Sequence, residues 1–232
     1  MSDLVLPQSP SPWLVNLAYP LGSFVILPSY FGKIEVDGQE NIPQTGPVII
    51  ASTHRSRWDA LVVPSVVGKC VSGRVPWFMV TADEMTGLQG WIISRLGCFP
   101  VNTSHPGADS IVKSISLLSK GEMLIIFPEG DIYRVADVHP LKRGVARIAL
   151  DVEQNNPGIG MKILPVSVRY SQDYPQWRTK VKVKIGTPLI AAQYQQESSR
   201  KATEQLTETL EKDLKELNGS NGFVNDARYD GK

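Results

Sequence analysis

The sequence predicts a single α/β domain in which a largely parallel mixed sheet is flanked by helices. Short apolar runs rich in β-branched residues, such as PVIIAS (47–52) and KILPVSVRY (162–170), have the length and composition of strands buried on both faces. Longer stretches with helical periodicity separate these runs. Strands that alternate with helices are typical of a layered α/β fold.

Size and composition narrow the possible classes of protein. The chain has 232 residues, which suits one domain with its own core. A net charge of +1 gives no reason to expect nucleic acid as a partner. The two cysteines, Cys70 and Cys98, are too few for a disulfide framework and fit a reducing compartment.

The expected strands follow from short apolar runs that end in glycine, proline or charged residues. An alternating pattern predicts a first strand within 32–46, followed by a turn-rich loop. In chain order, further strands are expected at 47–52, 76–85, 98–103, 122–130, 162–170 and 181–186.

The expected helices are shown by apolar residues three and four positions apart and by their end signals. They are predicted at 58–67, stopped by a proline, at 88–97, closed by Gly97, and at 107–121 and 142–155. A last amphipathic helix is marked by Ala202, Leu206, Leu210, Leu214 and Leu217.

The first 32 residues form an apolar arm. No charged residue lies between Asp3 and Lys33, and the apolar stretch 13–31 is interrupted by Asn16, Pro20, Gly22 and Pro28. These interruptions predict a broken segment that lies in or on a membrane surface, and packing of the arm on the protein's own core is the open alternative. The domain itself is expected at 33–218, followed by a disordered tail at 219–232.

His54 follows a predicted buried strand, and Asp59 follows it by five positions. On a regular helix these two side chains would lie about 140° apart. They can meet if His54 precedes a helix that Ser56 caps and that begins at Arg57. Asp59 would then fix the tautomer of the imidazole and leave its other nitrogen free to accept a proton. The alternative is a histidine satisfied in a turn beside a surface aspartate.

A second group of charged residues follows the strand that ends in FPEG (127–130). Glu129 ends this strand, and Lys142, Arg143 and Arg147 lie at the start of the next predicted helix. Such cations could hold an anionic substrate group. A tight turn followed by a solvated basic helix face is the alternative.

In combination, these blocks resemble the glycerolipid acyltransferase family, whose best-known members are the lysophosphatidic acid acyltransferases. The segment 30–60 is similar to the first block with its lead-in, with Thr53 where asparagine is usual. The later blocks are LGCFPVN (96–102), FPEGD (127–131) and ILPVSV (163–168), and IGTPL (185–189) is similar to the usual glycine-proline close of the domain. Four ordered blocks are a specific signal, and they cover most of the chain.

The resemblance implies that His54 is the general base and Asp59 its partner in transferring a fatty acyl group from a thioester to a hydroxyl. It implies that Glu129 and Gly130 bind the acceptor and shape the site. The donor would be acyl-CoA or acyl-acyl carrier protein, with no cofactor and no metal. The acceptor would be a lysolipid, most directly lysophosphatidic acid in phospholipid biosynthesis, at the cytoplasmic face of a membrane.

The chain departs from the family pattern where the acceptor phosphate is expected to bind. Thr103 follows Asn102 where the family commonly has arginine, and EGDIYR stands in place of EGTR. Arg134 could serve from a shifted loop, and Arg55 and Arg57 could take over anion binding. Another lysolipid or hydroxyl acceptor therefore remains open, as does an inactive lipid-binding relative.

A covalent or metal-dependent mechanism has little support in the sequence. Cys98 has no obvious base near it in sequence, and no GxSxG motif occurs. The three histidines, His54, His105 and His139, are scattered without metal-binding spacing.

Overall fold

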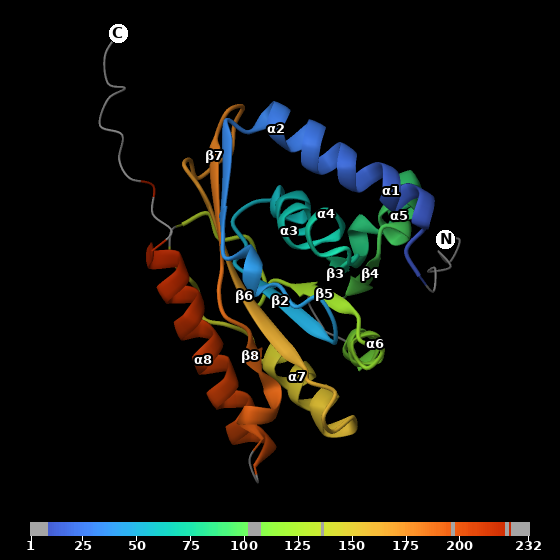
Figure 1. The fold of residues 1–232 in the computed structure, drawn as a ribbon, viewed down its shortest axis with the longest axis vertical. Helices are drawn as coiled ribbons and strands as arrows, with labels where there is room; N and C mark the ends of the chain where they lie inside the picture. Colours follow the sequence, from blue (N-terminus) through green and yellow to red (C-terminus); the bar gives the residue numbers. More distant parts are fainter. Residues whose placement is uncertain (1–8, 102–107, 136, 196–197, 221–222, 224–232) are drawn as a thin grey trace.

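The centre of the molecule is an eight-stranded mixed sheet (Figure 1). A computed structural model describes residues 9–101, 108–135, 137–195, 198–220 and 223. The strand order is β1-β7-β6-β2-β5-β3-β4, and the short β8 pairs with β6. The strands are β1 (Lys33–Asp37), β2 (Val48–Ser52), β3 (Trp77–Thr81), β4 (Cys98–Val101), β5 (Met123–Ile126), β6 (Lys162–Tyr170), β7 (Lys180–Ile185) and β8 (Leu189–Ile190).

The sheet is largely parallel, as the sequence predicts. Strand β2 pairs in parallel with both β5 and β6, and β3 pairs in parallel with β4 and β5. Only the pairs of β6 with β7 and β8 are antiparallel among the described strands. All five residues of β2 are buried, because helices cover both faces of the sheet.

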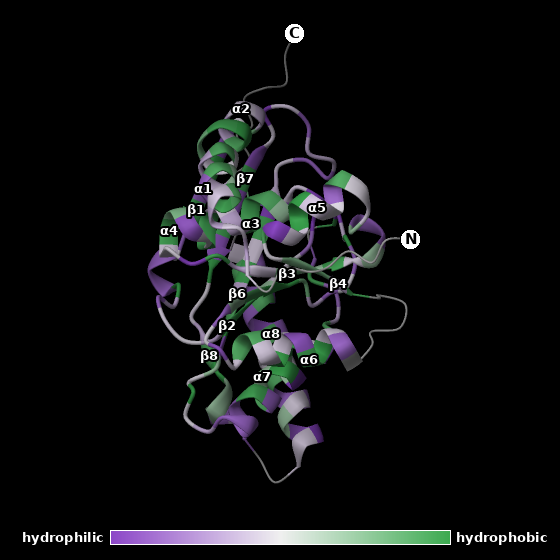
Figure 2. Cartoon of the chain, turned by 90° about the vertical axis from the view of Figure 1, so that its right-hand side faces the viewer, coloured by the Kyte–Doolittle hydropathy of each residue, from purple (hydrophilic) through white to green (hydrophobic). Residues whose placement is uncertain are grey.

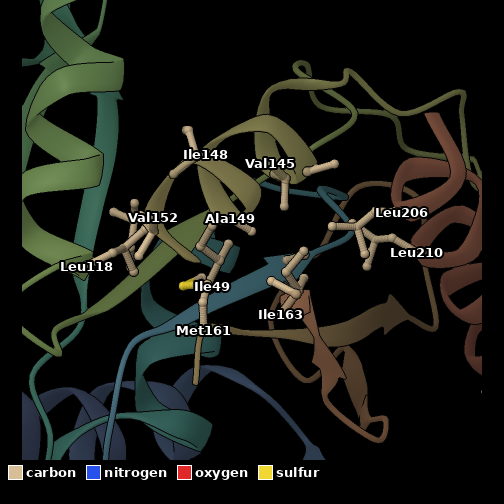
Figure 3. Close-up of a cluster of buried hydrophobic side chains, with 14 of the residues drawn as sticks. Ile49, Leu118, Val145, Ile148, Ala149, Val152, Met161, Ile163, Leu206 and Leu210 are labelled. Atoms are coloured by element: carbon tan, nitrogen blue, oxygen red, sulfur yellow. The ribbon is translucent and has the colours of Figure 1, made fainter. Parts of the chain in front are cut away.

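One face of the sheet is covered by α6 (Ala108–Leu118), α7 (Gly144–Asn155) and α8 (Ser199–Ser220). The close-up in Figure 3 shows the centre of this layer, where Val145, Ile148, Ala149 and Val152 of α7 lie among side chains of the sheet and of α8. Leu206, Leu210 and Leu214 of α8 are at most 1% exposed. The predicted apolar spacing of the last helix is therefore what attaches it to the core.

The opposite face is covered by α1 (Pro12–Leu21), α2 (Leu27–Tyr30), α3 (Asp59–Val67), α4 (Lys69–Ser72) and α5 (Gly87–Arg95). Val62, Val63 and Val67 of α3 are fully buried against the sheet, together with Leu27 of α2. Figure 2 shows hydrophobic residues following α2 and α3 on this side of the molecule.

The N-terminal arm is helical. A π-helical turn, Gly22–Ile26, joins α1 to α2, so that residues 12–30 form one rod on the sheet's second layer (Figure 1). Val15 and Leu27 face the core, and six other large apolar side chains are 38–69% exposed: Trp13, Leu17, Leu21, Phe24, Val25 and Ile26. The expected break at Pro20 and Gly22 is thus a local widening of the helix. Within the described residues, no helix is both long and apolar enough to cross a membrane.

Several element boundaries differ from the sequence prediction; β3 and β5, for example, end at Thr81 and Ile126, before the predicted ends at 85 and 130. Helix α3 ends at Val67, as predicted, but Pro64 lies inside it, so the prediction that proline stops the helix is wrong. The helix begins at Asp59, one residue after the start of the predicted range 58–67 and two residues after the start that capping by Ser56 implies. The last helix includes Gly219 and Ser220, which the sequence places in the tail, and most of the remaining tail lies outside the described residues.

Candidate active site

The predicted pair of His54 and Asp59 meets at the carboxyl end of β2. The Nδ1 atom of His54 lies 2.9 Å from Oδ2 of Asp59. His54 stands in the loop after β2 and Asp59 is the first residue of α3, which is the arrangement that the five-residue spacing requires. Such clustering where parallel strands end is typical of α/β sites.

The Asp59 carboxylate is fully buried and accepts four hydrogen bonds. Its Oδ2 accepts the backbone N–H groups of Arg55 at 2.6 Å and Ser56 at 2.8 Å, besides the imidazole. This is the geometry of a side chain that reaches back from a helix start to cap the preceding turn. The Oγ atom of Ser56, which the sequence expects as the cap, accepts the N–H of Trp58, two residues on, at 3.3 Å in the turn before α3.

Tyr170 completes the surroundings of Asp59, and the sequence did not reveal it. Its hydroxyl donates a hydrogen bond to Oδ1 of Asp59 at 2.7 Å from the end of β6, 111 residues away in the chain. Burial, followed by the charge of Asp59 and their hydrogen bond, raises the pKa of Tyr170 well above its usual value. The hydroxyl therefore keeps its proton and acts as a donor at neutral pH.

The imidazole of His54 is held in one orientation. Its ring stacks on that of Phe127, with centroids 3.9 Å apart and planes 10° apart. An ionised carboxylate can only accept hydrogen bonds, so Nδ1 donates to Asp59 and Nε2 carries a free lone pair. His54 also lines a cavity, in which this nitrogen can act as a proton acceptor.

Arg55 and Glu129 form a buried, two-pronged ion pair. Nη1 of Arg55 lies 2.6 Å from Oε2 of Glu129, and Nη2 lies 3.0 Å from Oε1. The two residues are 4% and 3% exposed. This pairing contradicts the expectation that Arg55 offers its guanidinium to a substrate anion, because its charge is already neutralised away from solvent.

The same ion pair ties the loop that carries His54 to the loop that follows β5. Glu129 accepts the backbone N–H of His54 and that of His139, each at 3.3 Å. Arg55 donates to the carbonyl oxygens of Tyr133 and Asp137. Glu129, which the family resemblance assigns to acceptor binding, thus holds two loops together and does not line the cavity.

A cavity of about 840 Å³ opens beside His54. Its walls are mainly apolar and come from the N-terminal rod, α3, α5, α6, α7 and the ends of β3, β4 and β5. A site of this size with an apolar wall and few polar groups suits an aliphatic ligand. Its polar rim is formed by Arg57, Glu84, Gln89, Gly130, Asp131 and Lys142.

The predicted cations are divided between this rim and other places. Arg57 and Lys142 lie at the rim, with Arg57 paired to Glu84 at 3.1 Å. Arg143 instead pairs with Glu204 of α8 at 2.7 Å, and Arg134 lies over the ring of Tyr174. Neither of these two lines the cavity, which contradicts their expected place in the site.

Two further residues bear on the predicted site. Gly130 has φ +81°, and a Cβ there would lie 2.3 Å from the side chain of Lys142, so glycine lets this lysine cross the turn. Asn102 lies outside the described residues.

Cys98 lines the apolar wall of the cavity. Burial raises the pKa of its thiol to about 12, which keeps it protonated and poorly nucleophilic. Its surroundings favour a structural role over that of a nucleophile.

Because Glu129 is buried with Arg55, we expect its substitution to destabilise the protein far more than substitution of Glu84, whose partner Arg57 is exposed. Glu129→Gln leaves the buried Arg55 charge uncompensated and is expected to lower the free energy of unfolding by about 3–5 kcal/mol. Glu84→Gln removes the partner of exposed Arg57 and is expected to cost less than about 1 kcal/mol. Denaturant unfolding of both variants checks this, and equal effects would contradict it.

Comparisons with known proteins agree with the fold and the motifs. A family model for acyltransferases matches residues 33–169. The chain is 29% identical over 203 residues to a 1-acyl-sn-glycerol-3-phosphate acyltransferase of Bacillus subtilis, covering 83% of this chain and 92% of that protein. It is 26% identical over 149 residues to a chloroplastic enzyme of the same name from Arabidopsis thaliana, covering 63% of this chain but 38% of that protein.

The fold is also that of a solved relative. The crystal structure of the 1-acyl-sn-glycerophosphate (LPA) acyltransferase PlsC from Thermotoga maritima matches with a TM-score of 0.65. The match covers 88% of this chain and 79% of that chain at 21% sequence identity. Since the family model spans more than half of the sequence and its motifs meet around His54, this chain belongs to the acyltransferase family.

Proposed function

We propose that the protein transfers a fatty acyl group from a thioester to the free hydroxyl of lysophosphatidic acid, forming phosphatidic acid for phospholipid biosynthesis. The observation that carries this proposal is the placement of His54 at an apolar cavity, with its Nδ1 held by buried Asp59. The names of the bacterial and chloroplastic relatives support the same reaction.

The reaction proceeds in one step of acyl exchange. Nε2 of His54 accepts the proton of the acceptor hydroxyl, while the oxygen of that hydroxyl bonds to the carbonyl carbon of the thioester. The carbon–sulfur bond then breaks, and the departing thiolate takes the proton from the imidazolium. Because a thioester is already activated, the protein's main tasks are to align the two substrates and to move this proton.

The donor's fatty chain enters the apolar part of the cavity. Gly22 lines it from the N-terminal rod, and a Cβ added there would meet nothing within 4 Å. This buried glycine leaves room for the end of the chain. The polar carrier, coenzyme A or acyl carrier protein, stays outside the rim.

The acceptor's phosphate binds near the cations of the rim. Lys142 is exposed there without a carboxylate within ion-pair distance among the described residues, whereas Arg57 is shared with Glu84. Asp131 on the same rim repels an anion. This mixed charge supports, as a second candidate, a lysolipid whose head group carries a positive charge beside the phosphate.

The exposed side of the N-terminal rod attaches the protein to the membrane that supplies the acceptor, at its cytoplasmic face. Its six exposed apolar side chains have no charged neighbour within residues 12–30, and residues 33–218 form the catalytic domain that the rod covers. Leu27, by contrast, is buried in the protein's own core and contributes nothing to attachment. Both cysteines are free, which fits the reducing side.

His54 is expected to be indispensable for turnover. His54→Ala should lower kcat at least ~10²-fold, the low end for loss of a positioned general base, while the variant stays folded. The measurement is release of free thiol from palmitoyl-CoA with lysophosphatidic acid. His139→Ala is the control, because His139 stacks on Tyr133 away from the cavity lining. Near-wild-type turnover of His54→Ala would rule out the mechanism.

Tyr170 is expected to act as a positioning residue. Tyr170→Phe removes one hydrogen bond to the Asp59 carboxylate, worth about 1.5–3 kcal/mol, and should lower kcat ~10- to 100-fold. The KM values for both substrates should stay unchanged, because Tyr170 does not line the cavity. An unchanged kcat in the folded variant would show that this hydroxyl does not support the base.

Membrane attachment is expected to depend on the exposed side of the rod. Leu17→Ser with Phe24→Ser should weaken binding to phosphatidylglycerol–phosphatidylethanolamine vesicles at least ~10²-fold, since each buried apolar side chain contributes about 1.5–3 kcal/mol. Vesicle flotation measures this, also in 1 M salt, where the wild type should stay bound. The control, Val112→Ser with Val135→Ser, removes side chains of similar exposure elsewhere. Equal loss in both variants would contradict the assignment.

A further inference from the structure

The cavity beside His54 reaches both faces of the sheet. Successive residues of β3 point to opposite sides, and both kinds line the cavity. Met79 packs with the core cluster that contains α7, whereas Val80 packs with the cluster that contains α3. The same division separates Ile126 from Phe127 at the end of β5.

The two sides connect where the pairing of β3 with β5 ends. Strands β3 and β5 pair over only two positions, Trp77 with Leu124 and Phe78 with Ile125. Beyond them β3 continues to pair with β4 as far as Thr81. Met79, Val80 and Ile126, which lie directly after the last paired positions, all line the cavity, so it reaches both faces of the sheet where the pairing of β3 with β5 ends.

The cavity therefore has two apolar lobes that meet near His54. The N-terminal lobe lies under the rod and α3 and is lined by Tyr19, Gly22, Leu61, Pro64, Val80 and Cys98. The α6–α7 lobe lies on the other side of the sheet and is lined by Met79, Ile111, Ile126, Val145 and Ile148. Val145 and Ile148 are shown on α7 in Figure 3.

We propose that the α6–α7 lobe binds the acyl chain that the acceptor already carries, while the N-terminal lobe binds the chain being transferred. This inference rests on the proposed acyl transfer and assigns the acceptor to the monoacyl lipids. Two aliphatic chains would then approach His54 from opposite faces of the sheet, with the hydroxyl of one beside the thioester of the other.

The polar groups of the rim support this assignment of the lobes. Lys142 and Gly144 line the cavity just before Val145, so a cation stands at the entrance of the α6–α7 lobe. A lysolipid with an anionic head group needs a cation next to an apolar channel. Buried Gly22 lines the N-terminal lobe and leaves open space beside it, which suits a chain that inserts end first from a carrier outside.

The two neighbours Met79 and Val80 provide a matched test. Met79→Phe should fill part of the α6–α7 lobe and Val80→Phe part of the N-terminal lobe, both by an apolar change beside open space. The acceptors are decanoyl and butyryl lysophosphatidic acid, each dissolved as monomers, and the donors are acyl-CoA esters of 8 to 18 carbons.

Met79→Phe is expected to raise the KM for the decanoyl acceptor at least ~10-fold and that for the butyryl acceptor less than ~2-fold, since displaced methylenes each contribute to binding. Its preference among donors should not change. Val80→Phe should shift the preference to a donor with a shorter chain. The ratio of the KM values for the two acceptors should stay unchanged. Ile111→Phe narrows the α6–α7 lobe from another element and should reproduce the effect of Met79→Phe.

The outcomes separate this inference from the proposed function. If Met79→Phe and Ile111→Phe change only the donor preference, or leave both acceptors unaffected, the α6–α7 lobe does not bind the acceptor chain. If the wild type transfers no acyl group to any lysolipid, the proposed function itself is wrong. Circular dichroism of each variant shows whether a loss of activity reflects unfolding.

Discussion

The buried carboxylate of Asp59 is the feature on which the site depends. Removing a charged group from water costs several kcal/mol unless hydrogen bonds and partners replace the lost solvation. Here two backbone N–H groups, one phenol and one imidazole supply those bonds, and they come from the loop after β2 and from the end of β6. The carboxylate therefore fixes the loop, the start of α3 and the ring of His54 at once.

The buried ion pair of Arg55 and Glu129 joins the loop after β2 to the loop after β5. Arg55 follows His54 directly in sequence, but its side chain points away from the cavity and forms two hydrogen bonds with Glu129. Two adjacent residues of one motif thus have different roles: His54 faces the cavity, and Arg55 binds Glu129 in the protein interior. The Asp59 carboxylate holds the turn that produces this division, because it accepts the N–H groups of both Arg55 and Ser56.

Local signals in the sequence were enough to predict the parts of the fold that depend on neighbouring residues. The β-branched run of β2 and the leucines of α8 form the strand and helix that their periodicity indicates. The five-residue spacing of His54 and Asp59 also has one natural solution, a turn followed by a helix start. Pro64 misled the prediction, since a helix packed on both sides tolerates an internal proline better than an isolated one.

Features that depend on register between distant strands were beyond such reasoning. Tyr170 meets Asp59 only because β6 lies beside β2 in a register that pairs Ser52 with Val166. Three arginines show the same dependence, because each points toward partners 40 to 82 residues away in the chain. Arg55 contacts Glu129 and Asp137, Arg134 contacts Tyr174, and Arg143 contacts Glu204. A motif names the residue type at such positions but not the direction of its side chain.

The two sides of the N-terminal rod differ, because one lines the cavity and the other is exposed. Ala18, Tyr19, Gly22 and Ser23 form part of the cavity wall, and their sequence neighbours Leu17, Leu21 and Phe24 have exposed side chains. Helical periodicity alone produces this arrangement from an almost uninterrupted apolar sequence. A bilayer bound to the exposed side would lie one helix diameter, about 10 Å, from the cavity. Lipid substrates would then reach His54 without their chains crossing a layer of water, which is the most costly step for an aliphatic molecule.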